Sequence, residues 1–245
     1  MRIADNIEIV EISINLNGKL NTVCPVLIKD NDGIALIDTG YPGQLQQIRE
    51  AAENAGMNYN EINRVILTHH DLDHIGCLAA IVNDLPGKVE VISHELEKPY
   101  VQGEITPLKM AQMEARLDSL NEQMKSLYEG MKRGYFISTA KVDRTVGDGD
   151  QIPFYGGIKI IHTPGHTHGH ISLYLKRIKT LIAGDIMFCE EGRLVAPPPS
   201  ANFNNTQAKE SIKKLTEFDI EKVICYHGGF FGDNPNQSIA EMAGM

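Results

Sequence analysis

Hydrophobic residues recur in short runs along the N-terminal part of the chain, and turn-forming residues separate the runs. Residues 7–14 alternate apolar with polar side chains, which predicts a half-buried strand. Residues 22–29 and 34–37 are two further apolar runs, and the Gly-containing segment 30–33 between them predicts a hairpin. Turns are predicted at residues 17–18 and 86–87, where glycine follows asparagine or proline.

The pattern then changes to alternating strands and helices. A helix of about a dozen residues is predicted after Pro42-Gly43, with apolar positions at helical spacing and Gly56 beyond its end. The apolar run at residues 65–67 predicts a short buried strand, and residues 75–82 predict the start of a helix. Strands are also predicted at these runs: 89–92, 141–146, 158–161, 171–175, 180–183 and 222–226.

Three further segments have a distinct character. Apolar residues recur at helical spacing through residues 109–132, which predicts an amphipathic helix that either packs on the sheet or forms a lid or dimer surface. Residues 195–202 include three consecutive prolines and predict a stiff loop. Residues 206–218 predict a helix that Thr206 caps.

Composition narrows the class of protein. The 245 residues are 42% hydrophobic and carry a net charge of −9, so the chain can bury a large core but lacks the basic balance of a nucleic-acid binder. No apolar stretch has the length of a signal peptide core or of a membrane span, which predicts a cytoplasmic protein that does not bind membranes. The four cysteines are far apart and in apolar surroundings, so we expect buried free thiols.

Metal-binding side chains gather at the ends of the predicted strands. The densest cluster follows the apolar run 65–67, at the carboxyl end of a strand, where α/β sheets usually place their chemistry. Others follow the strands that end near residues 161, 183 and 226. Together they are His69, Asp71, Asp73, His74, His166, Asp185 and His227.

Imidazole and carboxylate groups suit zinc, iron or manganese. Seven such donors are too many for one tetrahedral ion, but they fit two ions that share a carboxylate. We therefore expect two divalent metal ions per chain, with zinc as the leading candidate.

The motifs resemble those of the metallo-β-lactamase superfamily. They are the segments Thr68-His69-His70-Asp71-Leu72-Asp73-His74, Thr163-Pro164-Gly165-His166-Thr167, Gly184-Asp185, Tyr226-His227-Gly228 and Leu36-Ile37-Asp38-Thr39-Gly40. The resemblance implies an αββα sandwich, in which two mixed β-sheets lie face to face with helices outside. It also implies a single domain over residues 1–245, with a helical, lid-like insertion at about residues 94–133.

The resemblance further implies roles for these residues. His69, Asp71 and His166 would hold one metal ion, Asp73, His74 and His227 the other, and Asp185 would bridge both. Asp73 and Asp185 would also be catalytic, while Asp38 and His170 would support the ligands from behind. The family's usual motif is HxHxDH. Here Asp71 replaces its second histidine, which adds negative charge and should favour iron or manganese at the first site.

The implied activity is hydrolysis of an ester-type bond, namely a lactone, thioester, carboxylic ester or phosphoester, by a metal-bridging hydroxide. The expected substrate is a small molecule. A homodimer is possible, because segment 109–132, which contains several methionines, could form a dimer surface. Two alternatives stay open. One is an iron-dependent redox enzyme, performing oxygenase or persulfide chemistry on the same fold, and the other is a non-catalytic metal-binding sensor.

Overall fold

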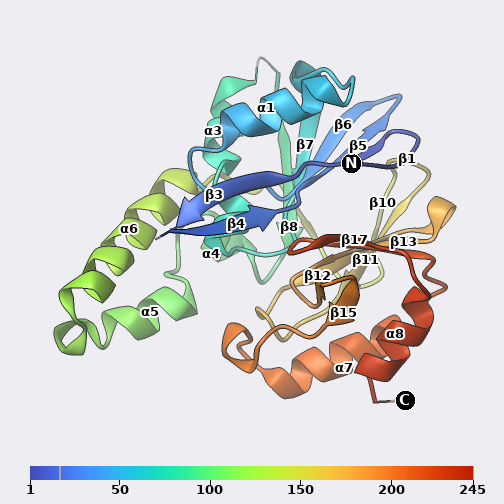
Figure 1. Cartoon of the computed structure of the whole chain (residues 1–245). Helices are drawn as coiled ribbons and strands as arrows, with labels where there is room; N and C mark the ends of the chain where they lie inside the picture. The colour runs from blue at the N-terminus through green and yellow to red at the C-terminus, as the bar shows by residue number, and fades with distance from the viewer. Residues whose placement is uncertain (17, 86, 245) are drawn as a thin grey trace.

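Two β-sheets pack face to face in the computed structural model, which describes residues 1–16, 18–85 and 87–244. The predicted turns at residues 17–18 and 86–87 each include a residue outside those ranges. Figure 1 shows helices on the two outer sides of the paired sheets and two helices that project to one side. This is the predicted αββα sandwich.

The first sheet contains seven strands in the order β1-β2-β5-β6-β7-β8-β9. Its amino-terminal part is antiparallel, and β6 to β9 are parallel neighbours. The strands are β1 (Arg2–Ala4), β2 (Ile7–Ile9), β5 (Val26–Asp30), β6 (Gly33–Ile37), β7 (Ile62–Ile66), β8 (Glu90–His94) and β9 (Arg144–Val146). Parallel strands place their carboxyl ends at one edge, and the predicted hairpin is β5–β6.

The second sheet contains six strands in the order β10-β11-β12-β13-β16-β17. Strands β11, β13 and β16 run in the same direction, because β12 pairs antiparallel with β11 and β13, whereas β13 and β16 are parallel. The strands are β10 (Gln151–Ile152), β11 (Ile158–His162), β12 (Ile171–Leu175), β13 (Thr180–Gly184), β16 (Lys222–Cys225) and β17 (Gly229–Phe231). Two hairpins stand beside the sheets: β3 (Ile12–Leu16) with β4 (Lys19–Val23), and β14 (Phe188–Glu190) with β15 (Arg193–Val195).

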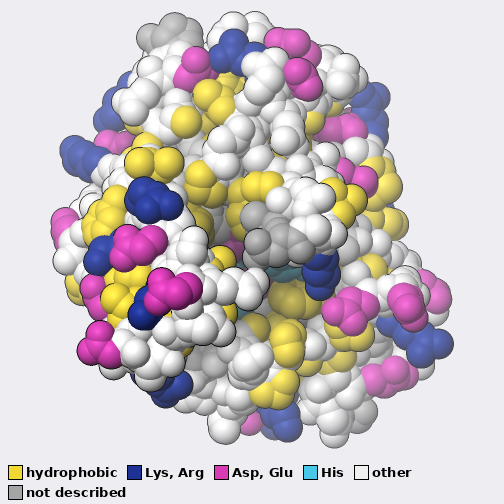
Figure 2. Space-filling view, turned by 60° about the vertical axis from the view of Figure 1, so that its left-hand side comes forward, with side chains coloured by type: hydrophobic (Ala, Val, Ile, Leu, Met, Phe, Trp, Pro, Cys, Tyr) yellow, Lys and Arg dark blue, Asp and Glu magenta, His cyan; other side chains and the backbone are white. Residues whose placement is uncertain are grey.

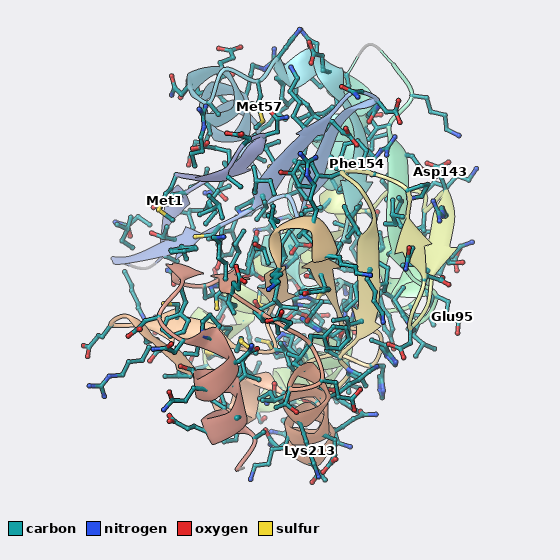
Figure 3. All side chains as sticks on the ribbon, turned by 90° about the vertical axis from the view of Figure 1, so that its right-hand side faces the viewer. Met1, Met57, Glu95, Asp143, Phe154 and Lys213 are labelled. Atoms are coloured by element: carbon teal, nitrogen blue, oxygen red, sulfur yellow. The ribbon has the colours of Figure 1, made fainter. Side chains whose placement is uncertain are left out.

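Alternating side chains divide the hydrophobic core into three layers. On β11, Ile158 and Ile160 join the layer between the sheets, while Ile161 joins the layer beneath the helices of the second sheet. Helices α1 (Leu45–Asn54) and α3 (Leu78–Asp84) cover the first sheet, and α7 (Asn205–Leu215) and α8 (Pro235–Met242) cover the second. Figure 3 locates these layers through Phe154, which lies between the sheets, and the exposed Lys213 on α7.

Several predicted elements are divided in the structure. The strand expected at residues 7–14 is split between β2 and β3, and residues 22–29 are split between β4 and β5. The helix expected at residues 75–82 is interrupted at Gly76 and Cys77, which separate α2 (Leu72–Ile75) from α3. A side chain at Gly76 would place its Cβ 2.4 Å from the Gly40 carbonyl oxygen, so this close approach of two loops requires glycine.

The segment 109–132 is not one helix. It forms α5 (Leu108–Glu114), the 3-10 turn η2 (Leu117–Ser119) and α6 (Glu122–Ser138), because Asn121 caps a new helix by accepting a hydrogen bond from the Met124 backbone N–H. With α4 (Lys98–Val101), these helices occupy the region predicted to be an insertion. In Figure 1, α5 and α6 project away from the sandwich.

Three further local predictions differ from the structure. Asn204, not Thr206, caps α7, since its side chain accepts a hydrogen bond from the Gln207 backbone N–H. Within the proline-rich loop, residues 199–201 form a 3-10 turn, η4 (Pro199–Ala201). The β14–β15 hairpin, β17 and α8 were not expected. Within the described part of the chain, none of the helices is long and apolar enough to cross a membrane.

Candidate metal centre

The candidate ligands follow strands whose carboxyl ends meet at one edge of the sandwich. Residues 69–74 follow β7, and His166 lies in the loop after β11. Asp185 directly follows β13. His227 follows β16 after one intervening residue, Tyr226. The helix expected to start at residue 75 starts at Leu72 instead, so Asp73 and His74 belong to the single turn of α2. The two sheets thus bring donors from distant parts of the chain to one place.

The structure brings all seven predicted donors together. They form three overlapping groups: His69, Asp71 and His166; His69, His74 and Asp185; Asp73, His74 and His227. In each group, one donor atom per residue lies within 4.8 Å of the others. The first and third groups are the two sets expected from sequence, and Asp185 lies between them.

Asp185 contacts both sides of the centre. Its Oδ2 lies 3.7 Å from His166 Nε2 and 3.3 Å from His227 Nε2, and its Oδ1 lies 3.4 Å from His74 Nε2. On one flank, Asp71 Oδ2 is 3.1 Å from His166 Nε2. A carboxylate in this central position is suited to bridge two cations.

Several donor atoms at the centre have no hydrogen-bond partner. His69 Nε2, His74 Nε2 and Asp185 Oδ1 are buried and unpartnered within the described chain. Burying such atoms without a partner costs free energy unless another group compensates. The donor set, nitrogen and carboxylate oxygen without thiolate, suits a divalent transition metal. These residues therefore fit the metal ions that the sequence predicts.

The protonation preferences of the two inner imidazoles differ. Burial, reinforced by the neighbouring His74, holds the pKa of His69 well below its usual range. Burial also opposes the charged form of His74, but the carboxylates of Asp185 and Asp38 outweigh it and raise the pKa of His74 well above its usual range. A surplus of negative charge therefore surrounds His74, which is the environment that a cation would stabilise.

Asp38 supports the first ligand loop from behind, the position predicted for it. Its Oδ1 accepts a 2.8 Å hydrogen bond from the Thr68 backbone N–H, and its Oδ2 lies 2.9 Å from His74 Nδ1. Asp38 adopts a positive φ of 58°, so this short loop after β6 holds a backbone conformation that few side chains adopt. The carboxylate fixes His74 so that its Nε2 faces the centre.

His170 supports the bridging carboxylate through the backbone. Its Nε2 accepts a 2.9 Å hydrogen bond from the Asp185 backbone N–H, and its Nδ1 donates to Thr163 Oγ1 at 2.9 Å. Burial lowers the pKa of His170 to about 3, so the ring is neutral and this tautomer is maintained. Gly184 makes room for the ring, since a Cβ there would lie 2.6 Å from His170 Nε2.

The sequence analysis missed two supporting residues. Tyr226 donates a 2.5 Å hydrogen bond to the Asp73 carbonyl oxygen and accepts one from the Gly40 backbone N–H at 3.1 Å. Glu97, which is fully buried, accepts hydrogen bonds from the His70 backbone N–H, Thr167 Oγ1 and the Gly169 backbone N–H at 2.9, 2.8 and 2.7 Å. Glu97 thus joins the loops after β7 and β11, and no motif pointed to it.

A third missed residue reaches the centre from the projecting helices. Lys109, on α5, places its Nζ 2.5 Å from Asp71 Oδ2 and 3.4 Å from His166 Nε2. Burial would lower the pKa of Lys109, but the carboxylates of Asp71 and Asp185 outweigh this and raise it. A protein cation therefore lies against the first group of donors. The position of this lysine within a helical stripe gave no signal of such a role.

Four further histidines of the described chain lie outside the donor groups. His70 is turned towards Glu97 and stacks on Tyr100 with ring centroids 4.3 Å apart. His94 is buried, stacks on His162 at 4.3 Å and accepts a hydrogen bond from the Leu96 backbone N–H, so it caps a turn and is not exposed. His168 packs against Phe203.

Comparison with known proteins places this arrangement in a family. The family model of the metallo-β-lactamase superfamily matches residues 23–227. The probable metallo-hydrolase YflN of Bacillus subtilis is 32% identical over 223 residues, covering 85% of this chain and 80% of that protein. A hydroxyacylglutathione hydrolase of Idiomarina loihiensis is 26% identical over 84% of this chain, which spans 61% of that protein.

Solved structures show the same fold. The metallo-β-lactamase family protein TTHA1429 of Thermus thermophilus matches with a TM-score of 0.77 and 20% identity, over 99% of this chain and 80% of that one. The subclass B3 metallo-β-lactamase BJP-1 of Bradyrhizobium japonicum matches with a TM-score of 0.62 and 22% identity, over 93% and 76%. The chain therefore belongs to the metallo-β-lactamase superfamily and is a metallo-hydrolase of that family.

Proposed function

We propose that this protein hydrolyses an ester-type bond of a small molecule at a centre for two divalent metal ions. The observation that carries the proposal is the overlap of the three donor groups around the buried Asp185, with unpartnered nitrogen and oxygen atoms between them. His69, Asp71 and His166 would hold one ion, Asp73, His74 and His227 the other, and Asp185 both. Zinc is the leading candidate, with iron or manganese as alternatives.

The protein's own groups set the geometry for this chemistry. When bound, two cations supply Lewis acidity and lower the pKa of a bound water molecule, so that hydroxide is available near neutral pH. Asp73, whose Oδ2 lies 3.3 Å from His227 Nε2 at the centre, would orient the attacking water. Hydrolysis joins the water oxygen to the acyl carbon or phosphorus, and the alcohol or thiol leaves with a proton. Asp38, Tyr226, Glu97 and His170 hold the donors in place.

The scissile bond is proposed to be an ester, lactone, thioester or phosphoester. The hydroxyacylglutathione hydrolases among the relatives make a thioester one option. Two side chains bear on the choice. Ile186 and Met187, which follow Asp185, are buried in the core of the second sheet and offer no hydroxyl group to a substrate.

The decisive experiment combines metal analysis with a substrate panel. We expect about two equivalents of zinc or manganese per chain and hydrolysis of at least one class among lactones, thioesters, carboxylic esters and phosphodiesters. Removing the metal with a chelator should abolish the activity, and adding zinc should restore it. Iron as the main metal, without hydrolysis of any panel member, would overturn the proposal in favour of the redox alternative.

A further inference from the structure

A large cavity opens beside the metal centre, between the sandwich and the projecting helices. Its volume is about 870 Å³, within the range of sites for small molecules. Apolar side chains from separate parts of the fold line it, among them Ile14, Leu72, Met110, Met124, Leu127 and Met131. Figure 2 looks onto this side of the molecule, where hydrophobic side chains surround a hollow.

The cavity is continuous with the proposed reaction centre. Asp71, Asp73 and Lys109 line it together with His70, and these four are the only acidic or basic residues in its lining as far as the structure describes the chain. The cavity therefore has an apolar body and one charged end, and that end consists of side chains of the metal centre. A ligand that matches this distribution has an apolar part attached to the group that reacts.

The apolar residues of α6 that face the cavity are not covered by the protein. Met124 and Leu127 are 36% and 42% exposed to solvent, whereas Tyr128 and Tyr135 of the same helix are buried. Met124 and Leu127, which line the cavity, are therefore open to a ligand. Methionine side chains adapt to flexible apolar partners.

A second, smaller cavity lies on the other side of Lys109. Its volume is about 160 Å³, and it also includes Asp71 and Lys109. Its lining mixes polar residues, such as Ser200 and Asn202, with Leu108 and Phe203. The two cavities therefore meet at the metal centre. This geometry suits a substrate with a long apolar arm on one side of the scissile bond and a small leaving group on the other.

We infer that the substrate is an ester or thioester of an aliphatic acyl chain, with the chain in the large cavity and the alcohol or thiol in the small one. The inference rests on the proposed function and specifies its substrate. Each methylene that moves from water into the cavity should improve kcat/KM about fourfold, until the chain fills the available length.

The test uses the zinc-loaded protein and N-acetylcysteamine thioesters with saturated acyl chains of increasing length. These share one small polar leaving group, so kcat/KM should rise with chain length from acetyl to decanoyl. The variant Gly130→Phe narrows the cavity, because Gly130 lines it and a Cβ there meets no atom within 4 Å. The loss caused by Gly130→Phe should grow with chain length, whereas Glu129→Phe, whose neighbouring position does not line the cavity, should follow the wild type.

Binding of the fatty acid products gives a readout that does not depend on hydrolysis. Decanoate should bind to the zinc-loaded protein more tightly than acetate in calorimetric titration, and Gly130→Phe should remove most of the difference. Hydrolysis of acetyl thioesters without any gain for longer chains, and without binding of decanoate, would overturn the inference and leave the proposed function intact. Chain-dependent binding of decanoate without hydrolysis of any ester would support the apolar site and contradict the proposed reaction.

Discussion

The two outer groups of donors differ in what holds them. In the group of Asp73, His74 and His227, the sandwich itself supplies the support: Asp38 Oδ2 lies 2.9 Å from His74 Nδ1, and Tyr226 bonds to the Asp73 backbone. In the group of His69, Asp71 and His166, the Asp71 oxygen that lies 3.1 Å from His166 also accepts a hydrogen bond from Lys109. The group of His69, Asp71 and His166 therefore shares the Asp71 Oδ2 atom with a cation of the projecting helices.

This difference indicates how a cation would be distributed. Donors that are already fixed lose little freedom on binding, so the group around His74 is prepared to bind a metal ion. At the other group, an incoming ion must compete with the Lys109 ammonium for the same Asp71 oxygen. We therefore expect the group around His74 to bind a metal ion first and more tightly.

The largest effect is expected for Asp185→Asn, because Asp185 contacts both groups. The amide cannot supply the shared negative charge, so metal content should fall and kcat/KM should fall by about a thousandfold or more, the scale of several kcal/mol of lost stabilisation. Elemental analysis and single-substrate kinetics measure both. Asp219→Asn, which changes a surface carboxylate paired with Lys179, is the control. Full activity in a folded, metal-depleted Asp185→Asn protein would falsify the two-ion mechanism.

The next largest effect is expected on folding, for Glu97→Ala. The substitution leaves His70, Thr167 and the Gly169 backbone N–H without their shared buried acceptor. Removing one partner of a buried pair costs about 3–5 kcal/mol, and urea unfolding of the chelator-treated protein should show a loss of that size. A loss below about 1 kcal/mol, the level of an exposed ion pair, would mean that the two ligand loops do not depend on Glu97.

The stability lost in Glu97→Ala should depend on pH, and the pKa shifts of Glu97 and His70 determine in which direction. Burial disfavours both charges, but the His70–Glu97 contact lowers the pKa of Glu97 and raises the pKa of His70. The carboxylate contribution is present above the unfolded pKa of Glu97 and is lost as pH falls through its lowered folded value. The imidazolium contribution is present below the unfolded pKa of His70 and is lost as pH rises through its raised folded value. The stability difference from Glu97→Ala should therefore be largest between about pH 4.5 and 6.5.

A smaller effect is expected for Asp38→Ala, and it should be confined to one group of donors. Without the carboxylate, the Thr68 backbone N–H loses its acceptor and His74 Nδ1 keeps only the longer contact with Thr68 Oγ1 at 3.2 Å. Such supporting residues contribute about 10–100-fold in metal affinity. Zinc titration against a chromophoric chelator should show weaker binding of the first equivalent only. Equal weakening of both equivalents would show that the donors act as one unit, and the comparison of two groups would fail.

The candidate donors at strand ends could be read from local pattern, whereas the sandwich was implied by the resemblance of the motifs to the metallo-β-lactamase superfamily. Apolar runs of strand length end in turns that bear histidine or aspartate, and parallel strands must bring those ends to one edge. The predicted bounds of a helix were wrong at a point where two distant segments of the chain lie in close contact. The expected helix is divided at Cys77, which leaves the helical conformation beside Gly76. Gly76 lies against the Gly40 loop, and no periodicity in the sequence records that contact.

The residues that sequence reasoning missed all act across long chain separations. Glu97 joins loops at residues 70 and 167–169, and Tyr226 reaches from β16 to Asp73. Lys109 occupies a stripe whose spacing alone predicts an amphipathic helix. A single charged residue on such a helix is normally solvated, so only the fold reveals that it meets Asp71. The role of the ligands, in contrast, stays a prediction that metal titration must test.

The smallest effect, and the sharpest test of the comparison, is expected for Lys109→Met. The substitution keeps most of the apolar side chain, removes the ammonium 2.5 Å from Asp71 Oδ2, and so frees that oxygen for a metal ion. Removing one nearby positive charge should tighten binding of the second zinc equivalent about tenfold, since screening by solvent reduces the charge repulsion to about 1–2 kcal/mol. Lys132→Met, which breaks a pair with Glu114 between α5 and α6, is the matched control and should bind zinc as the wild type does. Weaker binding of the second equivalent in Lys109→Met would mean that the lysine holds Asp71 in place for the ion and does not compete with it, and the difference between the two groups would then lie in which element supports them.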